Sequence, residues 1–302
     1  MTVAEIYKNT VDELHTADVP EAEENARLLL EAYFGIKRID ILAEPGKNID
    51  ESHSEDFRAA LERRKKREPI QHILGKTCFM GIDFKITPDA LIPRPDTEIL
   101  VEEVLRNLRD GSRILDLCTG SGCILTSLLK FSNYCEGVGI DISEKALALA
   151  RENAESILGS LNVSESDTDG PTGEKAAIEF IQGDLFDPLR ERNREDDRFD
   201  IIVSNPPYIK SDVIATLEPE VRDYEPMIAL DGLNNGLYFY EKIIPQAAAF
   251  LAPGGMLFFE IGFDQGEDVS SLMKKQGYID VNIVKDYSGL DRVVYGTKSV
   301  LM

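Results

Sequence analysis

The sequence predicts an α/β protein in which an open, mostly parallel β-sheet follows a small bundle of helices. After residue 110, short apolar runs that end in glycine or polar turns alternate with helix-like stretches, which is typical of βα units. Before residue 69, apolar residues recur at helical spacing instead. We therefore expect helices in residues 1–75, a β-hairpin connector in 76–95 and the sheet domain in 96–302.

The first 75 residues predict three helices without a catalytic cluster of their own. The first helix is indicated by side chains at helical spacing, namely Val3, Ile6, Tyr7, Thr10, Val11 and Leu14. A second helix should end at Gly35, and a third should run from Glu55 to Arg67. The bundle either docks a substrate or only stabilises the chain, and the sequence leaves both possibilities open. After it, the alternating segment 79–86 predicts the hairpin.

Apolar runs predict the strands of the sheet. In chain order they are Ile114–Leu117, Gly137–Asp141, Ile178–Gln182, Phe199–Ser204, Met256–Ile261, Val281–Lys285 and Val293–Thr297. Thr97 is a candidate cap for a helix over Ile99–Leu108. Two polar stretches, Gly159–Lys175 and Arg190–Arg198, predict surface loops.

The composition is that of a soluble enzyme. The chain has 302 residues, of which 43% are hydrophobic, enough for two domains with apolar cores. It shows neither a run of 18 apolar residues nor a secretory signal, so no membrane association is expected. Its cysteines (Cys78, Cys118, Cys123 and Cys135) show no Cys-x-x-Cys spacing. We expect thiols in a reducing cytoplasm, no metal and a monomer.

The charge of the chain argues against nucleic acid as a direct partner. The net charge is -22, from 33 basic and 55 acidic residues, whereas nucleic-acid binding depends on neutralising phosphates. One basic run, Arg63–Arg67, stands out. A solvated helix face is its simpler interpretation, in preference to a binding patch.

The most informative motif is Asn205-Pro206-Pro207-Tyr208, directly after the strand Phe199–Ser204. Ligands of open α/β sheets bind beyond the carboxyl ends of the strands. Two prolines cannot donate backbone hydrogen bonds and have fixed φ angles, so the turn is rigid. The motif can therefore hold a planar NH2 group. The Asn205 oxygen and the Pro206 carbonyl would accept its hydrogens, and the Tyr208 ring would pack on its face.

A glycine turn, Cys118-Thr119-Gly120-Ser121-Gly122, follows the strand Ile114–Leu117 and predicts a ligand site. Glycines let the backbone approach a ligand closely. Position 125 is Leu, which departs from the dinucleotide fingerprint, and no Gly-Lys-Ser/Thr follows, which excludes a phosphate loop. Asp141 ends the next strand and can accept both hydroxyls of a ribose. Asp184 and Leu185, after the third strand, can flank an adenine.

Four successive predicted strands are thus followed by candidate site residues. These are, in order, the glycine turn, Asp141 for the ribose, Asp184 beside the adenine, and Asn-Pro-Pro-Tyr. This order resembles the S-adenosylmethionine-dependent methyltransferases that act on amino groups conjugated to a π-system. The resemblance implies a Rossmann-like sheet, S-adenosylmethionine as cofactor and S-adenosylhomocysteine as product. Those enzymes usually have glycine where Cys118 stands, so close backbone approach at residue 118 is in question.

Further segments, spread over nearly the whole chain, narrow this resemblance to the protein-(glutamine-N5) methyltransferases of peptide chain release factors. They are Glu68–Gly75, Ile92–Glu98, Val203–Ile209, Glu218–Arg222, Tyr224–Pro226, Ala229–Leu230 and Asp291–Val294. The resemblance implies methylation of the glutamine in the Gly-Gly-Gln motif of bacterial release factors. It makes Asn205, Pro206 and Tyr208 catalytic and adds Pro207 to the substrate site.

Two alternatives stay open at this point. An adenine- or cytosine-amino methyltransferase would use the same tetrapeptide on a nucleic acid, although it would have to extract its base and hold a polyanion. A non-catalytic S-adenosylmethionine-binding protein would keep the glycine turn and the ribose acid but would not need Asn205 and Tyr208.

Overall fold

The computed structural model describes residues 1–159, 163–164, 178–192 and 198–299. The chain divides into two compact units: Met1–Lys76 with Leu217–Tyr224, and Thr77–Thr216 with Glu225–Met302. Segment 217–224, which lies within the range predicted for the sheet domain, groups with the helices. Within the described ranges, no helix is both long enough and apolar enough to cross a membrane.

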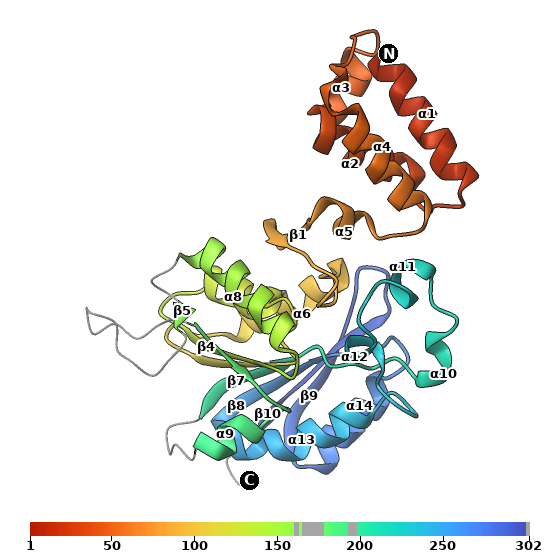
Figure 1. The fold of residues 1–302 in the computed structure, drawn as a ribbon. Helices are drawn as coiled ribbons and strands as arrows, with labels where there is room; N and C mark the ends of the chain where they lie inside the picture. Colours follow the sequence, from red (N-terminus) through yellow and green to blue (C-terminus); the bar gives the residue numbers. More distant parts are fainter. Residues whose placement is uncertain (160–162, 165–177, 193–197, 300–302) are drawn as a thin grey trace. The chain divides into compact units, whose positions relative to one another are not determined.

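The helical unit is built on three longer helices that share one core (Figure 1). They are α1 (Val3–Thr16), α2 (Ala22–Phe34) and α4 (Ser54–Lys65), and the shorter elements are α3 (Arg38–Ala43), η1 (Glu51–His53), α5 (Ile70–Leu74) and α11 (Pro219–Arg222). The core includes Leu14, Leu29, Leu30, Phe57 and Leu61. Gly35 ends α2 with a φ of 66°, as predicted, since glycine adopts the left-handed conformation readily.

The basic run at the end of α4 is a solvated face only in part, because Arg63 and Lys66 are exposed whereas Arg64 is buried and Arg67 is half-buried. The Arg64 side chain is only 4% exposed. It donates to Asn25 Oδ1 at 2.7 Å and to Glu220 Oε1 at 2.9 Å. Arg67 binds Glu220 through Nε at 2.6 Å and Glu218 through Nη2 at 2.8 Å. Acidic residues about 150 positions later thus pair with Arg64 and Arg67, and these bonds anchor segment 217–224 within the helical unit.

The second unit contains two sheets among its described residues. Strands β1 (Lys76–Phe79) and β2 (Ile82–Lys85) form the predicted hairpin. The larger sheet has the order β5-β6-β4-β3-β7-β8-β10-β9. Its strands are β3 (Arg113–Leu117), β4 (Glu136–Asp141), β5 (Val163–Ser164), β6 (Ile178–Gln182), β7 (Phe199–Ser204), β8 (Leu251–Glu260), β9 (Tyr278–Lys285) and β10 (Asp291–Lys298). Among the described strands of this larger sheet, only the pairings of β10 are antiparallel.

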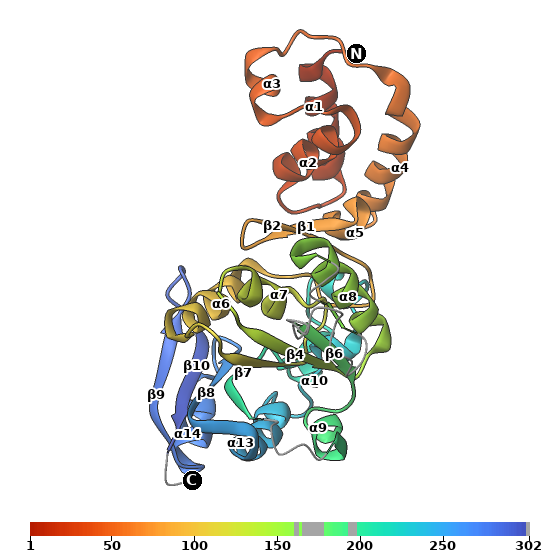
Figure 2. The ribbon, with the colours of Figure 1, turned by 90° about the vertical axis from the view of Figure 1, so that its left-hand side faces the viewer.

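Helices cover both faces of this sheet, as its apolar central strands require. One face carries α6 (Pro95–Asn107), α7 (Cys123–Lys130) and α8 (Glu144–Leu158) (Figure 2). The other carries α9 (Asp187–Arg192), α13 (Tyr238–Phe250) and α14 (Gly266–Lys275) (Figure 1). Short helices α10 (Ser211–Ile214) and α12 (Met227–Leu230) follow β7. The mostly parallel, helix-covered sheet confirms the predicted fold class.

Some predicted element ends need correction. Helix α6 begins at Pro95 rather than Ile99, because proline suits the first helical position, and Thr97 is therefore a buried residue of its first turn instead of its cap. Residues 190–192 belong to α9 rather than to a loop. The rest of that predicted loop up to 197, and most of the predicted insertion 159–175, lie outside the described residues.

Candidate active site

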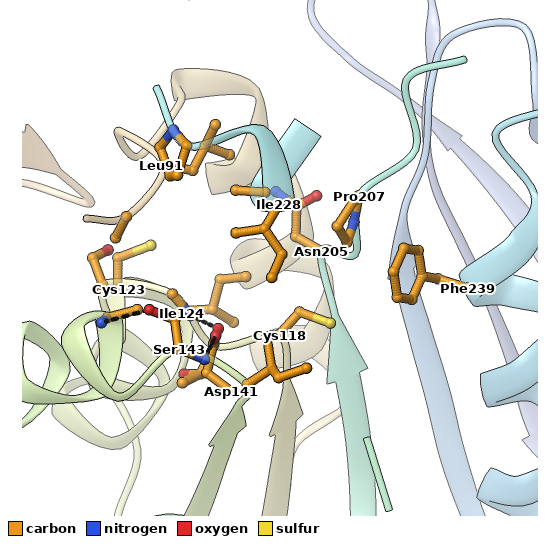
Figure 3. A pocket seen from close by; sticks show the side chains of 18 of the residues that line it. Leu91, Cys118, Cys123, Ile124, Asp141, Ser143, Asn205, Pro207, Ile228 and Phe239 are labelled. Atoms are coloured by element: carbon orange, nitrogen blue, oxygen red, sulfur yellow. Dashed lines mark hydrogen bonds between the residues drawn. The ribbon is translucent and has the colours of Figure 1, made fainter. Parts of the chain in front are cut away.

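A cavity of about 280 Å³ lies at the carboxyl ends of β3, β4, β6 and β7 (Figure 3). These strands run parallel, so the segments that follow them meet at one edge of the sheet. Most of the predicted site residues line this cavity, namely Cys118, Thr119, Gly120, Ser121, Asp141, Asp184, Leu185, Asn205 and Pro207. Gly122, Pro206 and Tyr208 do not line it.

The two glycines of the turn after β3 do different things. Gly120 has a φ of 56°, and a Cβ there would meet no atom within 4 Å, so a ligand can approach its backbone. Gly122 has a φ of 75°, and a Cβ there would come within 2.9 Å of the Ala150 Cβ. Gly122 thus lets α7 start close to α8, and its expected place in the ligand site is not supported by this geometry.

Cys118 adopts the conformation that a glycine would supply. Its φ is 58°, in the left-handed region that non-glycine residues rarely occupy. The residue still lines the cavity (Figure 3), so the side chain does not remove position 118 from the site. Burial raises the pKa of the Cys118 thiol well above its usual value, which argues against a thiolate nucleophile here.

Asp141 joins β4 to the glycine turn. Its Oδ2 accepts from the Gly120 N–H at 2.9 Å and its Oδ1 from the Ser143 N–H at 2.9 Å. Burial raises the pKa of Asp141, although these backbone bonds act in the opposite direction. The carboxylate therefore shapes the turn, and Asp141 also lines the cavity.

Asp116 is a structural partner of the same turn that the sequence analysis did not single out. It is fully buried in β3, and its Oδ2 accepts from Thr119 Oγ1 at 2.6 Å. Burial raises the pKa of Asp116 to about 7. An acidic residue inside an otherwise apolar strand was the signal that could have revealed it.

The Asn-Pro-Pro-Tyr turn is held from several sides. Asn205 donates through Nδ2 to Thr97 Oγ1 at 3.4 Å, which leaves its Oδ1 free to accept. The Tyr208 carbonyl accepts from Gln265 Nε2 at 3.1 Å. A Cβ on Gly232 would lie 2.6 Å from the Tyr208 Cα, so only glycine permits this close approach. Asn205 faces the same cavity as Asp141 (Figure 3).

The tyrosine hydroxyl of this turn is also engaged. Tyr208 Oη donates to Glu260 Oε1 at 3.3 Å. Burial raises the pKa of Tyr208 well above its usual value, so the hydroxyl stays protonated. A phenol held in this way fixes the position of the ring.

Three segments that do not directly follow a strand also line the cavity, and the sequence analysis did not assign them to the site. They contribute Leu91, Arg94 and Thr97, then Pro226, Ile228 and Ala229, then Tyr238, Phe239 and Lys242. Ile228 and Phe239 give the cavity apolar walls (Figure 3). Arg94 donates to the buried Glu225, which joins the segment before α6 to the segment before α12.

These residues fit an S-adenosyl group. An open approach to the Gly120 backbone, a carboxylate that can accept from ribose hydroxyls and apolar walls are what that group requires. Asn205 adds an acceptor at the same cavity. Among the described residues, no group of three His, Cys, Asp or Glu side chains is placed to hold a metal ion.

Comparison with known proteins first defines the class. Residues 95–218 match the family model "Methyltransferase small domain", and residues 5–75 match "PrmC N-terminal domain". A crystal structure of a methyltransferase from Pyrococcus furiosus aligns over 80% of this chain and 98% of its own, with a TM-score of 0.50. At 17% identity this likeness concerns the fold alone. The chain is a methyltransferase.

Closer relatives define the family. The release factor glutamine methyltransferase of Geobacter sulfurreducens is 42% identical over 90% of this chain and 90% of its own. That of Caulobacter vibrioides is 39% identical over 100% of this chain and 98% of its own. The chain belongs to the release factor glutamine methyltransferase family, as the resemblance of its motifs predicted.

Proposed function

We propose that this protein transfers a methyl group from S-adenosylmethionine to the side-chain amide of the glutamine in the Gly-Gly-Gln motif of bacterial release factors. The observation that carries the proposal is that Asn205 faces the same cavity as Asp141 and the Gly120 backbone. An amide acceptor and a nucleoside site therefore share one space. The relatives' activity, together with this arrangement, supports glutamine as the acceptor.

The cofactor site is proposed to use residues from three strand ends. Asp141 would accept from the ribose hydroxyls, and the backbone around Gly120 would approach the methionine end. Asp184 and Leu185 would flank the adenine. S-adenosylmethionine, when bound, supplies an electrophilic methyl group, and transfer forms a carbon–nitrogen bond while the carbon–sulfur bond breaks.

The Asn-Pro-Pro-Tyr turn would orient the acceptor. A carboxamide nitrogen is a poor nucleophile because its lone pair is delocalised into the carbonyl. Asn205 Oδ1, at the cavity, would accept one of its hydrogens. The Pro206 carbonyl and the Tyr208 ring, which do not line the cavity itself, would hold the second hydrogen and the amide plane from the adjoining part of the turn. Such alignment alone can contribute ~7–11 kcal/mol to lowering the barrier. Fixed acceptors also stabilise the positive charge that develops on nitrogen before a proton leaves to water.

Substitution of Asn205 tests the acceptor role. Asn205→Ala should lower kcat at least ~100-fold while cofactor affinity changes little, because the lost contact acts on the reacting group. Asn205→Asp retains an acceptor and should keep more activity than Asn205→Ala. Methyl transfer from labelled cofactor to purified release factor measures both.

A parallel reaction with nucleic acid as the methyl acceptor completes this experiment. Labelled DNA or RNA in place of release factor should receive no methyl groups from the wild-type protein. Wild-type rates for Asn205→Ala on release factor would refute the mechanism, whereas methylation of nucleic acid alone would refute the proposed substrate.

The proposal extends to the helical unit and to the setting of the enzyme. Residues 1–75 would contact the release factor away from its glutamine, since an exposed amide offers little specificity by itself. The enzyme would act as a monomer in the cytoplasm without binding nucleic acid directly, which the net charge of -22 supports.

A further inference from the structure

Glu260 is a buried carboxylate that the proposed chemistry does not use. It ends β8 and is only 2% exposed. Its neighbour Phe259 pairs with Ser204 of β7, the residue directly before Asn205. Glu260 therefore lies beside the point where the Asn-Pro-Pro-Tyr turn leaves the sheet, yet it does not line the cavity.

Side-chain contacts connect Glu260 to both ends of that turn. Its Oε1 accepts from Tyr208 Oη at 3.3 Å. On the other side, Thr97 Oγ1 accepts from Asn205 Nδ2 at 3.4 Å, and the Thr97 side chain lies close enough to Glu260 to lower the pKa of that carboxyl. The Glu260 carboxylate and the Tyr208 hydroxyl thus lie in one polar cluster with Thr97 and Asn205, which line the cavity.

An ion pair does not account for this buried charge. Arg292 lies close enough to lower the pKa of Glu260, but its Nη2 binds Asp286 at 3.1 Å and Asp96 at 3.3 Å. Glu260 Oε2 has no hydrogen-bond partner in the part of the chain that the structure describes. A buried carboxylate with one unpartnered oxygen costs stability, so a purely structural role would be served better by an apolar side chain.

We propose that Glu260 is a positioning residue for methyl transfer, which fixes Tyr208 directly and Asn205 through Thr97. The inference rests on the proposed function. The carboxylate would keep the tyrosine ring and the asparagine oxygen in one fixed relation, so that the acceptor amide is aligned in a single pose.

Glu260→Met provides the main test, because methionine has a similar length and no acceptor oxygen. We expect kcat on release factor to fall at least ~10-fold, with cofactor affinity and KM within ~3-fold of wild type. The thermal midpoint should not fall, since the variant removes a buried charge. Glu260→Gln keeps an acceptor for Tyr208 and should recover part of the lost rate.

A matched control and a second variant make the result specific. Glu103 is also mostly buried, on α6, but it binds Arg106, and Glu103→Met should leave kcat unchanged. Thr97→Val removes the hydroxyl that connects Glu260 to Asn205 and should lower kcat, whereas Thr97→Ser should retain it. In a Tyr208→Phe background, Glu260→Met should cost less than it does alone, because one shared contact is already absent.

The outcomes separate the inference from the proposed function. Wild-type kcat for Glu260→Met would overturn the positioning role while leaving the methyltransferase assignment intact. If the thermal midpoint and the cofactor affinity both fall together with kcat, the residue only maintains the folded structure, and this result would also overturn the positioning role. A wild-type protein that fails to methylate release factor would overturn both proposals.

Discussion

At the scale of single residues, Asp141 carries two functions that one substitution would remove together. Its carboxylate holds the N–H groups of Gly120 and Ser143, and it faces the proposed ribose position. Asp141→Ala should therefore weaken S-adenosylmethionine binding at least ~100-fold, as expected for loss of a charged double acceptor. Calorimetric titration measures this affinity, and an unchanged circular dichroism spectrum is the control for folding. Unaltered affinity would remove Asp141 from the cofactor site.

Glu260 makes a second residue-scale prediction, for stability against pH. Burial raises its pKa from 4.5 to about 6, so folding favours the protonated form. The resulting stability is fully present below pH 4.5 and is lost as pH rises through 6. A shift of this size corresponds to about 2 kcal/mol. Glutamine at position 260 cannot ionise. The free energy of unfolding of Glu260→Gln, relative to that of wild type, should therefore increase from pH 5 to pH 8. A constant difference across that range, measured by urea denaturation, would contradict this.

At the scale of elements, segment 217–224 depends on the end of α4. Glu220 accepts from Arg64 and Arg67, and the Arg64 side chain is only 4% exposed. Glu220→Lys would leave a buried arginine without its acidic partner and should destabilise the helical unit by roughly 3–5 kcal/mol. Urea denaturation would measure the loss, and hydrogen exchange should show faster opening of residues 217–224.

The same Glu→Lys substitution on the exposed face of α4 provides the control. Glu62 pairs with Lys65 at the surface, and its side chain is 51% exposed. Because exposed pairs contribute little, Glu62→Lys should change the free energy of unfolding by less than ~1 kcal/mol. Equal effects of the two substitutions would show that burial of Arg64 does not matter.

At the scale of the whole molecule, cofactor binding should depend on the cavity alone, whereas turnover of intact release factor should also depend on the helical unit. All residues that line the cavity belong to the unit formed by Thr77–Thr216 and Glu225–Met302. A chain without residues 1–76 should thus keep cofactor affinity, measured by calorimetry, but lose at least ~10-fold in turnover of intact release factor, because it lacks the proposed docking surface. A short Gly-Gly-Gln peptide should be affected less. Full turnover of release factor by the truncated chain would refute docking.

Much of the site was predictable because its residues follow strands directly. The carboxyl ends of parallel strands meet, so Gly120, Asp141, Asp184 and Asn205 could be brought together from their sequence positions alone. For Gly122 the sequence was less informative, because a glycine pattern does not distinguish close ligand approach from close helix packing. The Ala150 side chain, which decides the matter, is distant in sequence.

The amino-acid sequence by itself determined the strands, their polar ends and therefore the class of chemistry. Local apolar periodicity and rigid Pro-Pro geometry are short-range properties that a single segment expresses alone. Only the tertiary structure decided which side chains hold the site and the helical unit in place. Thr97, Glu260 and Glu220 bond to residues more than 50 positions away, and their roles arise from burial and charge pairing that exist only after the chain has folded.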